Sequence, residues 1–288
     1  MKNSNLWLVL GGLGAILVMI YIKGIRWSLL LWMQGYRYSV WNCFLIYMNS
    51  LFWGSVTPGR AGDFIKVVYL KEDLKQSMGF GMSSVFSDRV FDLYILLVMG
   101  GLGLLLYPLP QDPNLVHSVE VFFVVLVGVS VLVLNQKIGG VFLKAIFQKM
   151  MGEGLKARTD QAFEDFHRGM QAYYRPAILG PVALTVCSYT AYFFGCYLLA
   201  VSMGIQINVF YLAFVVSVVN IVSLLTFAGM GTREGALILL FRIVDLSKEQ
   251  ALAYSFMTFI VGVLIISLLG FVCYLAKPMK WKKKSDEL

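Results

Sequence analysis

The sequence has few charged residues. Only 14% of its 288 residues are Asp, Glu, Lys or Arg, whereas 59% are hydrophobic and the mean hydropathy is +0.75. A soluble domain carries about a quarter charged residues, so this composition excludes a soluble globular protein. We therefore expect a polytopic integral membrane protein of the all-α class, formed as one membrane domain over residues 1–288.

Histidine and cysteine are also scarce. The two histidines, His117 and His167, lie far apart in polar connections, and the four cysteines lie in apolar segments without the spacing of metal ligands. This pattern predicts neither a metal site nor a disulfide framework, and we expect no cofactor. The chain also lacks a nucleotide-binding loop. Any transport would therefore be driven by a gradient or by the concentration difference of the transported molecule itself.

Acidic residues are fewer than basic ones, which gives a net charge of +8. The basic residues cluster beside apolar runs, where the positive-inside rule explains them, so we expect no nucleic-acid partner. Residues 23–39 and the lysines after Leu275 are predicted to be cytoplasmic, because they carry basic residues next to apolar spans. Residues 107–118 have three prolines and no Lys or Arg, which is typical of an external turn. The sequence thus predicts a multi-pass protein of the cell membrane, with the N-terminus outside and the C-terminus inside.

The apolar runs are long enough for several spans. Between residues 135 and 176 the chain is polar and amphipathic, which predicts a cytoplasmic linker with a helix at the membrane interface. A second amphipathic run in this linker, residues 163–173, could equally pack against the bundle. The predicted spans are Leu6–Ile22, Val85–Leu106, Val119–Leu134, Ala177–Met203 and Ala251–Leu275.

Two Gly-rich segments with opposite charges interrupt apolar runs. Thr57–Asp63 divides residues 40–70, whose second arm is too short to span, and Phe227–Ala236 divides a similar hairpin. We expect both hairpins to be re-entrant or broken. The units 40–106 and 209–275 would then enter from opposite sides of the membrane, which is the pattern of an inverted repeat with its binding site near the midplane.

These breaks predict an anion site. The first residues of a half-helix have unpaired backbone N–H groups and a partial positive charge. An arginine at the bilayer centre costs about 2.5 to 3.5 kcal/mol, so the arginines should face the protein interior. The candidate substrate-binding residues are Gly59, Arg60, Gly62, Asp63, Asp88, Arg89, Asp92, Gly231, Arg233 and Glu234.

The acidic candidates suggest how the charges pair. Asp88 and Asp92 lie on one helical face, and an arginine such as Arg60 or Arg233 would relieve their repulsion. The alternative is a set of ion pairs that only holds the hairpins together. Lys66 could either extend towards the membrane surface or bind.

Over nearly its whole length the chain resembles the flippase-like membrane domain of lysylphosphatidylglycerol synthases and of related stand-alone proteins. The resemblance implies movement of an anionic lipid between leaflets, such as an aminoacylated phospholipid or a polyprenyl-phosphate carrier. Only thirteen residues follow Leu275, so we expect no soluble aminoacyltransferase domain and no lysyl transfer. The motifs that carry the resemblance are Arg26-Trp27, Pro58–Asp63, Asp88-Arg89 with Asp92-Leu93, and Gly229–Ala236.

Two other functions remain open. The chain could be a non-catalytic membrane partner of a separate glycosyltransferase or aminoacyltransferase, for which the same cavity would hold the lipid. It could also be a membrane enzyme that acts on lipid phosphate. The sequence favours the enzyme least, because it shows no nucleophile with a neighbouring base and no metal cluster.

Overall fold

The computed structural model describes residues 5–107, 156–173, 176–223 and 231–278, together with residues 124, 128, 226 and 229. For residues 58–60 and 156–160 it describes the backbone alone. Every element in these parts is a helix, which confirms the predicted all-α membrane fold. Four helical segments are long and apolar enough to cross a bilayer. They are α1 (Leu6–Met33), α4 (Met78–Leu106), the segment Pro176–Ser202 and the segment Lys248–Ala276.

The last two segments are compound. Pro176–Ser202 joins a short 3₁₀ turn, η3 (Pro176–Ile178), to α8 (Leu179–Ser202). Lys248–Ala276 consists of α11 (Lys248–Phe259), the π-helical turn η6 (Ile260–Ile265) and α12 (Ile266–Ala276). Ser247 and Gln250 form a capping box before α11. The predicted span 119–134 and the first amphipathic run after it lie outside the described residues.

The first hairpin returns to the side from which it starts. It consists of α2 (Val40–Ser55), the 3₁₀ helix η1 (Pro58–Phe64) and α3 (Ile65–Leu74). Pro58 stands at the start of η1, where a missing N–H costs nothing. The Tyr38 hydroxyl, just before α2, donates a hydrogen bond to Asp73 near the end of α3. Because the two ends of the hairpin touch, it returns to its own side, and η1 breaks it as the sequence predicted.

The second hairpin is built in the same way. It consists of α9 (Val209–Val222), the break, and α10 (Thr232–Arg242). Asn208 caps α9 by accepting hydrogen bonds from two backbone N–H groups at its start. The hydroxyl of Tyr211, near the start of α9, donates to the carbonyl oxygen of Leu240 near the end of α10 at 2.5 Å. This hairpin therefore also returns to its own side.

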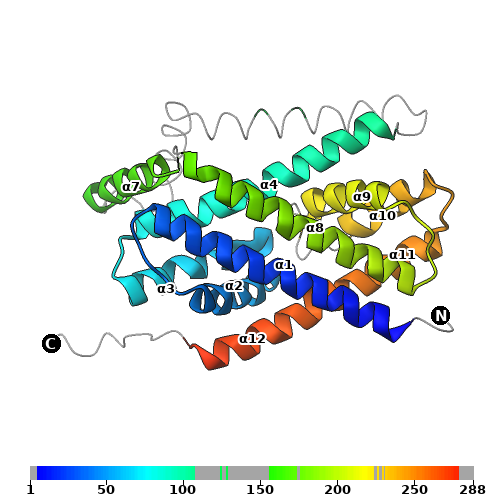
Figure 1. Ribbon diagram of the computed structural model, residues 1–288, viewed down its shortest axis with the longest axis horizontal. Helices are drawn as coiled ribbons and strands as arrows, with labels where there is room; N and C mark the ends of the chain where they lie inside the picture. The colour runs from blue at the N-terminus through cyan, green and yellow to red at the C-terminus, as the bar shows by residue number, and fades with distance from the viewer. Residues whose placement is uncertain are drawn as a thin grey trace.

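The two hairpins enter from opposite ends of the molecule (Figure 1). At one end, the N–H of Asn5 donates to the carbonyl oxygen of Ser202 at 3.3 Å, and the rings of Tyr107 and Tyr211 meet with centroids 4.9 Å apart. At the other end, the Lys277 amine donates to the Tyr38 hydroxyl at 2.7 Å. The relative sides of these turns agree with those predicted from the basic residues.

Contacts between the two halves are reciprocal. α2 packs on α12, α4 packs on α9, and α1 packs along α8. At two of these interfaces a glycine allows the close approach. A Cβ at Gly270 of α12 would lie 2.4 Å from the Met48 oxygen of α2, and a Cβ at Gly103 of α4 would lie 2.0 Å from the Phe214 ring of α9. The pattern favours repeat units that also include α1 and α8. The division at 40–106 and 209–275 stays a prediction.

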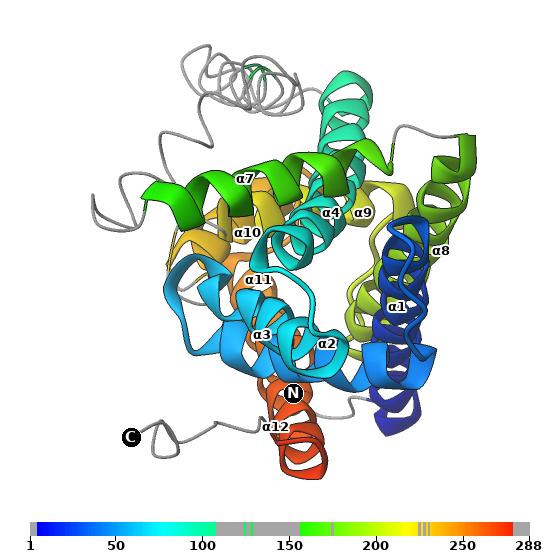
Figure 2. The ribbon, with the colours of Figure 1, turned by 90° about the vertical axis from the view of Figure 1, so that its left-hand side faces the viewer.

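One predicted boundary differs from the structure, and one open alternative is decided by it. The first span does not end at Ile22, since α1 continues to Met33 and buries Lys23 and Arg26. These two residues therefore give no evidence for a cytoplasmic loop. The run 163–173 packs against the bundle, because α7 (Lys156–Gln171) lies across α4 (Figure 2). There, Phe166 is buried with its ring centroid 5.7 Å from that of Phe86.

Candidate functional site

A cavity of about 340 Å³ lies between the two halves. Both hairpins and the spans α1, α4, α8 and α11–α12 contribute to its wall. Most of this wall is apolar, with residues such as Ile16, Leu96 and Val219. Charged side chains reach it from the first half, including Asp63 and Arg89, and Arg233 reaches it from the second. The cavity thus joins the two breaks that the sequence singled out.

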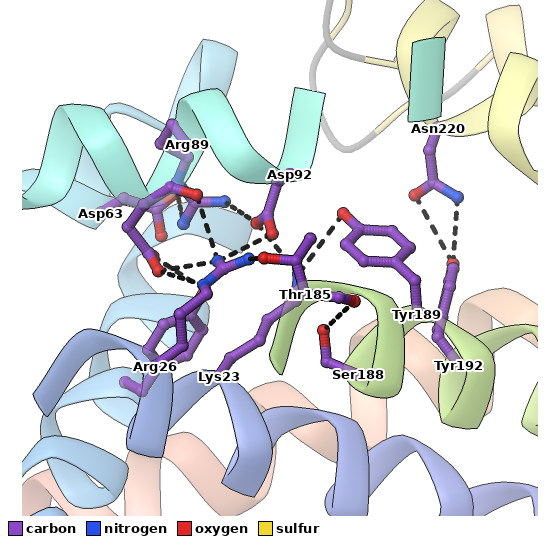
Figure 3. A network of polar contacts seen from close by, with 12 residues as sticks. Lys23, Arg26, Asp63, Arg89, Asp92, Thr185, Ser188, Tyr189, Tyr192 and Asn220 are labelled. Atoms are coloured by element: carbon purple, nitrogen blue, oxygen red, sulfur yellow. Dashed lines mark hydrogen bonds and ion pairs between the residues drawn. The ribbon is translucent and has the colours of Figure 1, made fainter. Parts of the chain in front are cut away.

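Seven charged residues form one network beside the cavity (Figure 3). In the bilayer such side chains are costly unless they pair with each other, and here every one has an oppositely charged partner. Four are basic and three are acidic, so the network carries a net charge of +1 when all are ionised. Its members are Lys23, Arg26, Asp63, Lys66, Asp88, Arg89 and Asp92.

Arg26 is the centre of this network, and it is fully buried. Its Nη2 lies 2.7 Å from Asp88 Oδ1 and 2.8 Å from Asp92 Oδ1, so it bridges the two carboxylates. Its Nη1 donates to Thr185 Oγ1 of α8 at 2.9 Å. The predicted relief of repulsion between Asp88 and Asp92 is therefore present, but Arg26 supplies it. We expected Arg60 or Arg233 to relieve this repulsion. That was wrong for Arg233, which is paired with Glu234. The Arg60 side chain is not among those that the structure describes.

Two lysines form ion pairs with the second carboxylate oxygens of Asp88 and Asp92. Lys66 Nζ lies 3.1 Å from Asp88 Oδ2 and 3.4 Å from the centroid of the Tyr47 ring. Lys23 Nζ lies 2.9 Å from Asp92 Oδ2. The Lys66 side chain is thus buried and paired, and it does not extend to the membrane surface. With these partners, Asp88 and Arg26 are held inside the protein and do not line the cavity.

Arg89 and Asp63 are two of the four network residues that line the cavity, together with Lys23 and Asp92. Arg89 is paired with Asp63, and its Nη1 lies 3.7 Å from Asp92 Oδ2, beyond hydrogen-bond distance. Its Nε has no hydrogen-bond partner among the described residues, and neither has Asp63 Oδ1. A buried polar atom without a partner costs about 1 to 3 kcal/mol. The Arg89 side chain is 29% exposed and lines the cavity, so it can reach a polar group there.

Arg233 of α10 reaches the cavity from the second half of the chain. Its Nε donates to Ser255 Oγ at 3.0 Å and its Nη2 to Glu234 Oε1 at 2.9 Å. The guanidinium carbon lies 5.0 Å from the centroid of the Phe259 ring, within the range of a cation–π contact. Nη1 makes no hydrogen bond within the part of the chain that the structure describes. Arg233 is therefore held from one side and keeps a donor for a ligand.

In each break a side chain accepts a hydrogen bond from a backbone N–H group of the same break. The Gly231 N–H donates to Glu234 Oε2 at 2.7 Å, and the Gly62 N–H donates to Thr57 Oγ1 at 2.7 Å. The prediction that the half-helices present unpaired N–H groups was wrong for these two. Gly231 has a φ of 82°, which favours glycine. These contacts give both glycines and Glu234 structural roles, and of Gly59 only the backbone is described.

Sequence reasoning missed Lys23, Arg26, Lys66 as an ion-pair partner, and Thr185. The structure brings four of the candidates, Asp63, Asp88, Arg89 and Asp92, into the network, and it places Arg233 with Glu234 at a separate site. One signal could have found the missing partners. Lys23 and Arg26 are three residues apart, and so share a face of the first helix, as Asp88 and Asp92 do on α4.

Two broken helix hairpins around an internal, mostly apolar cavity define a polytopic helical membrane protein whose candidate site lies between its halves. A family model described as the lysylphosphatidylglycerol synthase TM region matches residues 1–270, and the chain belongs to this family. The chain is similar to the UPF0104 membrane protein MJ1595 of Methanocaldococcus jannaschii, with 21% identity over 98% of this chain and 88% of that protein. No solved structure matches the chain.

Proposed function

We propose that this protein moves an anionic, phosphate-bearing lipid between the leaflets of the cell membrane. The observation that carries the proposal is the cavity between the halves, which receives Arg89 from one half and Arg233 from the other. Each guanidinium keeps at least one nitrogen without a hydrogen bond to the described residues. Arginine is well suited to phosphate, because its planar donors match the phosphate oxygens.

The size and lining of the cavity favour a lipid headgroup. About 340 Å³ is at the lower end of the range for small-molecule sites, which is enough for a phosphate headgroup but too little for the acyl chains as well. The acyl chains would therefore stay in the bilayer. The wall between the two arginines is mostly apolar, whereas a channel for sugars or amino acids would need more polar side chains. Both candidate lipids, an aminoacylated phospholipid and a polyprenyl phosphate, meet these requirements.

The test measures headgroup movement in proteoliposomes. A fluorescent phosphatidylglycerol and a fluorescent diacylglycerol are compared by bleaching with an impermeant reductant. We expect protein-dependent movement of the phosphatidylglycerol alone. Arg233→Gln should slow it about 10- to 150-fold, because a hydrogen bond to a charged group contributes about 1.5 to 3 kcal/mol. Arg60→Ala removes the arginine of the other break, and it should abolish movement of the phosphatidylglycerol.

A matched control is Arg168→Gln on α7, whose side chain is 68% exposed and, among the described residues, pairs with Glu164 four residues earlier. It should move lipid at the rate of the wild type. Equal movement of both fluorescent lipids would contradict the proposal, as would uptake of glycerol phosphate without lipid movement. Binding of phosphatidylglycerol without movement would instead favour the non-catalytic partner of a glycosyltransferase or aminoacyltransferase.

The proposal includes an orientation. Arg37, in the turn after α1, is exposed and should be cytoplasmic, whereas Gln206, in the uncharged turn after α8, is exposed and should be outside. Single cysteines at these positions, in a background without the four native cysteines, test it in intact cells. An impermeant maleimide should label the cysteine at position 206 only. The reverse pattern would invert the proposed orientation.

A further inference from the structure

Asp63 differs from the other two carboxylates of the network in its partners. Asp88 accepts hydrogen bonds from Arg26, Tyr47 and Lys66. Asp92 accepts hydrogen bonds from Lys23 and Arg26. Asp63 is paired with Arg89, and its Oδ1 has no partner among the described residues although the residue is only 3% exposed.

Asp63 and a bound phosphate would compete for the same cation. Both Asp63 and Arg89 line the cavity, and Arg89 is the guanidinium of the network with an unpaired Nε. An anion that binds this guanidinium with two hydrogen bonds takes the place of the carboxylate. Asp63 would then be a buried charge without its counter-ion. Such a charge costs several kcal/mol in a medium of low dielectric constant, and a carboxylate avoids this cost by taking up a proton.

Among the residues whose side chains the structure describes, no other cation of the network is ready to replace Arg89 as the partner of Asp63. The Lys66 amine donates to Asp88, and the Lys23 amine donates to Asp92. Both acids keep these partners when Arg89 turns to an anion. The titratable and charged groups around Asp63 are Lys23 of α1, Tyr47 of α2, Lys66 of α3, and Asp88, Arg89 and Asp92 of α4.

We infer that Asp63 is a proton-binding site that couples lipid movement to a proton, so that one lipid anion and one proton cross together. This inference rests on the proposed function. In the bound state the phosphate accepts hydrogen bonds from the Arg89 guanidinium, and the Asp63 carboxylate carries a new O–H bond. No bond of the lipid changes. The site gains one negative charge from the lipid and one positive charge from the proton, so the step is electroneutral.

Electroneutral coupling has two measurable consequences. A pH gradient drives the lipid towards the alkaline side, because the proton leaves there, and one pH unit corresponds to a tenfold concentration ratio. A membrane potential of either sign has no effect on the rate. A lipid anion that crossed without a proton would show the opposite behaviour, since moving one charge through 100 mV changes the free energy by about 2.3 kcal/mol.

The experiment uses phosphatidylglycerol, because a phosphodiester does not titrate between pH 5 and 8. Proteoliposomes with a fluorescent phosphatidylglycerol receive either a pH gradient or a potassium diffusion potential. For the wild type we expect a lipid distribution that follows the pH gradient and ignores the potential. Asp63→Asn should still bind phosphatidylglycerol but lose the response to pH. Glu164→Gln, an exposed carboxylate on α7, should keep it.

A second measurement does not depend on any variant. A pH-sensitive dye trapped inside wild-type vesicles should report about one proton for each lipid moved. Lipid movement without proton flux would overturn the coupling and leave the transport function in place, as would a pH response that persists in a folded Asp63→Asn protein. Absence of phosphatidylglycerol movement under all gradients would overturn both proposals.

Discussion

Replacing Arg26 with alanine should destabilise the protein more than removing any other single charge at the helix packing interfaces. Arg26 makes five hydrogen bonds: three to Asp88, one to Asp92 and one to Thr185. Hydrogen bonds between membrane helices average about 0.6 kcal/mol, so five correspond to about 3 kcal/mol. Breaking a buried ion pair on one side costs about 3 to 5 kcal/mol. The two estimates agree on a loss of about 3 to 5 kcal/mol.

The assay is unfolding of the purified protein in detergent, followed by its intrinsic tryptophan fluorescence. A double-mutant cycle separates the pair from the rest: Arg26→Ala combined with Asp88→Asn should lose less than the sum of the single changes. Arg168→Ala removes an exposed pair between residues four apart and should change the free energy of unfolding by no more than about 0.5 kcal/mol.

The outcome also decides what the network is for. If Arg26→Ala were as stable as the wild type but inactive in lipid movement, Arg26 would be a binding group, and its assignment as the structural centre of the network would be refuted. If it were unstable, the deep part of the network would hold the helices together. The sequence left open whether the charged residues bind a ligand or only form ion pairs that hold the structure together. The geometry favours the structural role for Arg26 and Asp88 in particular.

Three further changes test the breaks and the end of α12. Gly62→Ala should cost about 1 to 3 kcal/mol in the unfolding assay, because its Cβ would lie 2.2 Å from the carbonyl of Trp53. Gly231→Ala meets no atom within 4 Å and should lose only about 1 to 2 kcal/mol through its positive φ. Lys277→Met removes a partly exposed ion pair with Asp73, so the same assay should show a loss below about 1 kcal/mol.

The sequence predicted the four spans that the structure describes and both hairpins, because these depend on local signals. Pro58 and the closely spaced glycines after it disfavour a continuous α-helix at this point of the chain. Apolar length decides whether a segment can cross a bilayer. The capping box of Ser247 with Gln250 is local as well. None of these features requires knowledge of which helices touch.

The candidate site was harder to predict because its pairs join distant segments. Lys23 and Arg26 follow an apolar run of ordinary span length, so the positive-inside rule assigned them to a loop. The structure shows that α1 continues through them, and the 62 positions between Arg26 and Asp88 hide the pairing from any local rule. The π-helical turn η6, which brings Gly262 to the cavity wall, has no recognised signal in the sequence.

The distribution of charge finally explains why an anion suits this cavity better than a cation. Among the described residues, the network of the first half has four basic and three acidic members, while Arg233 of the second half is balanced by Glu234. An unbalanced cation near the bilayer centre is costly, and a bound phosphate would offset it. The deep pairs already satisfy Arg26 and Lys66. Arg89 and Lys23 bring this positively charged network to the cavity wall, on the surface that the lipid headgroup would touch.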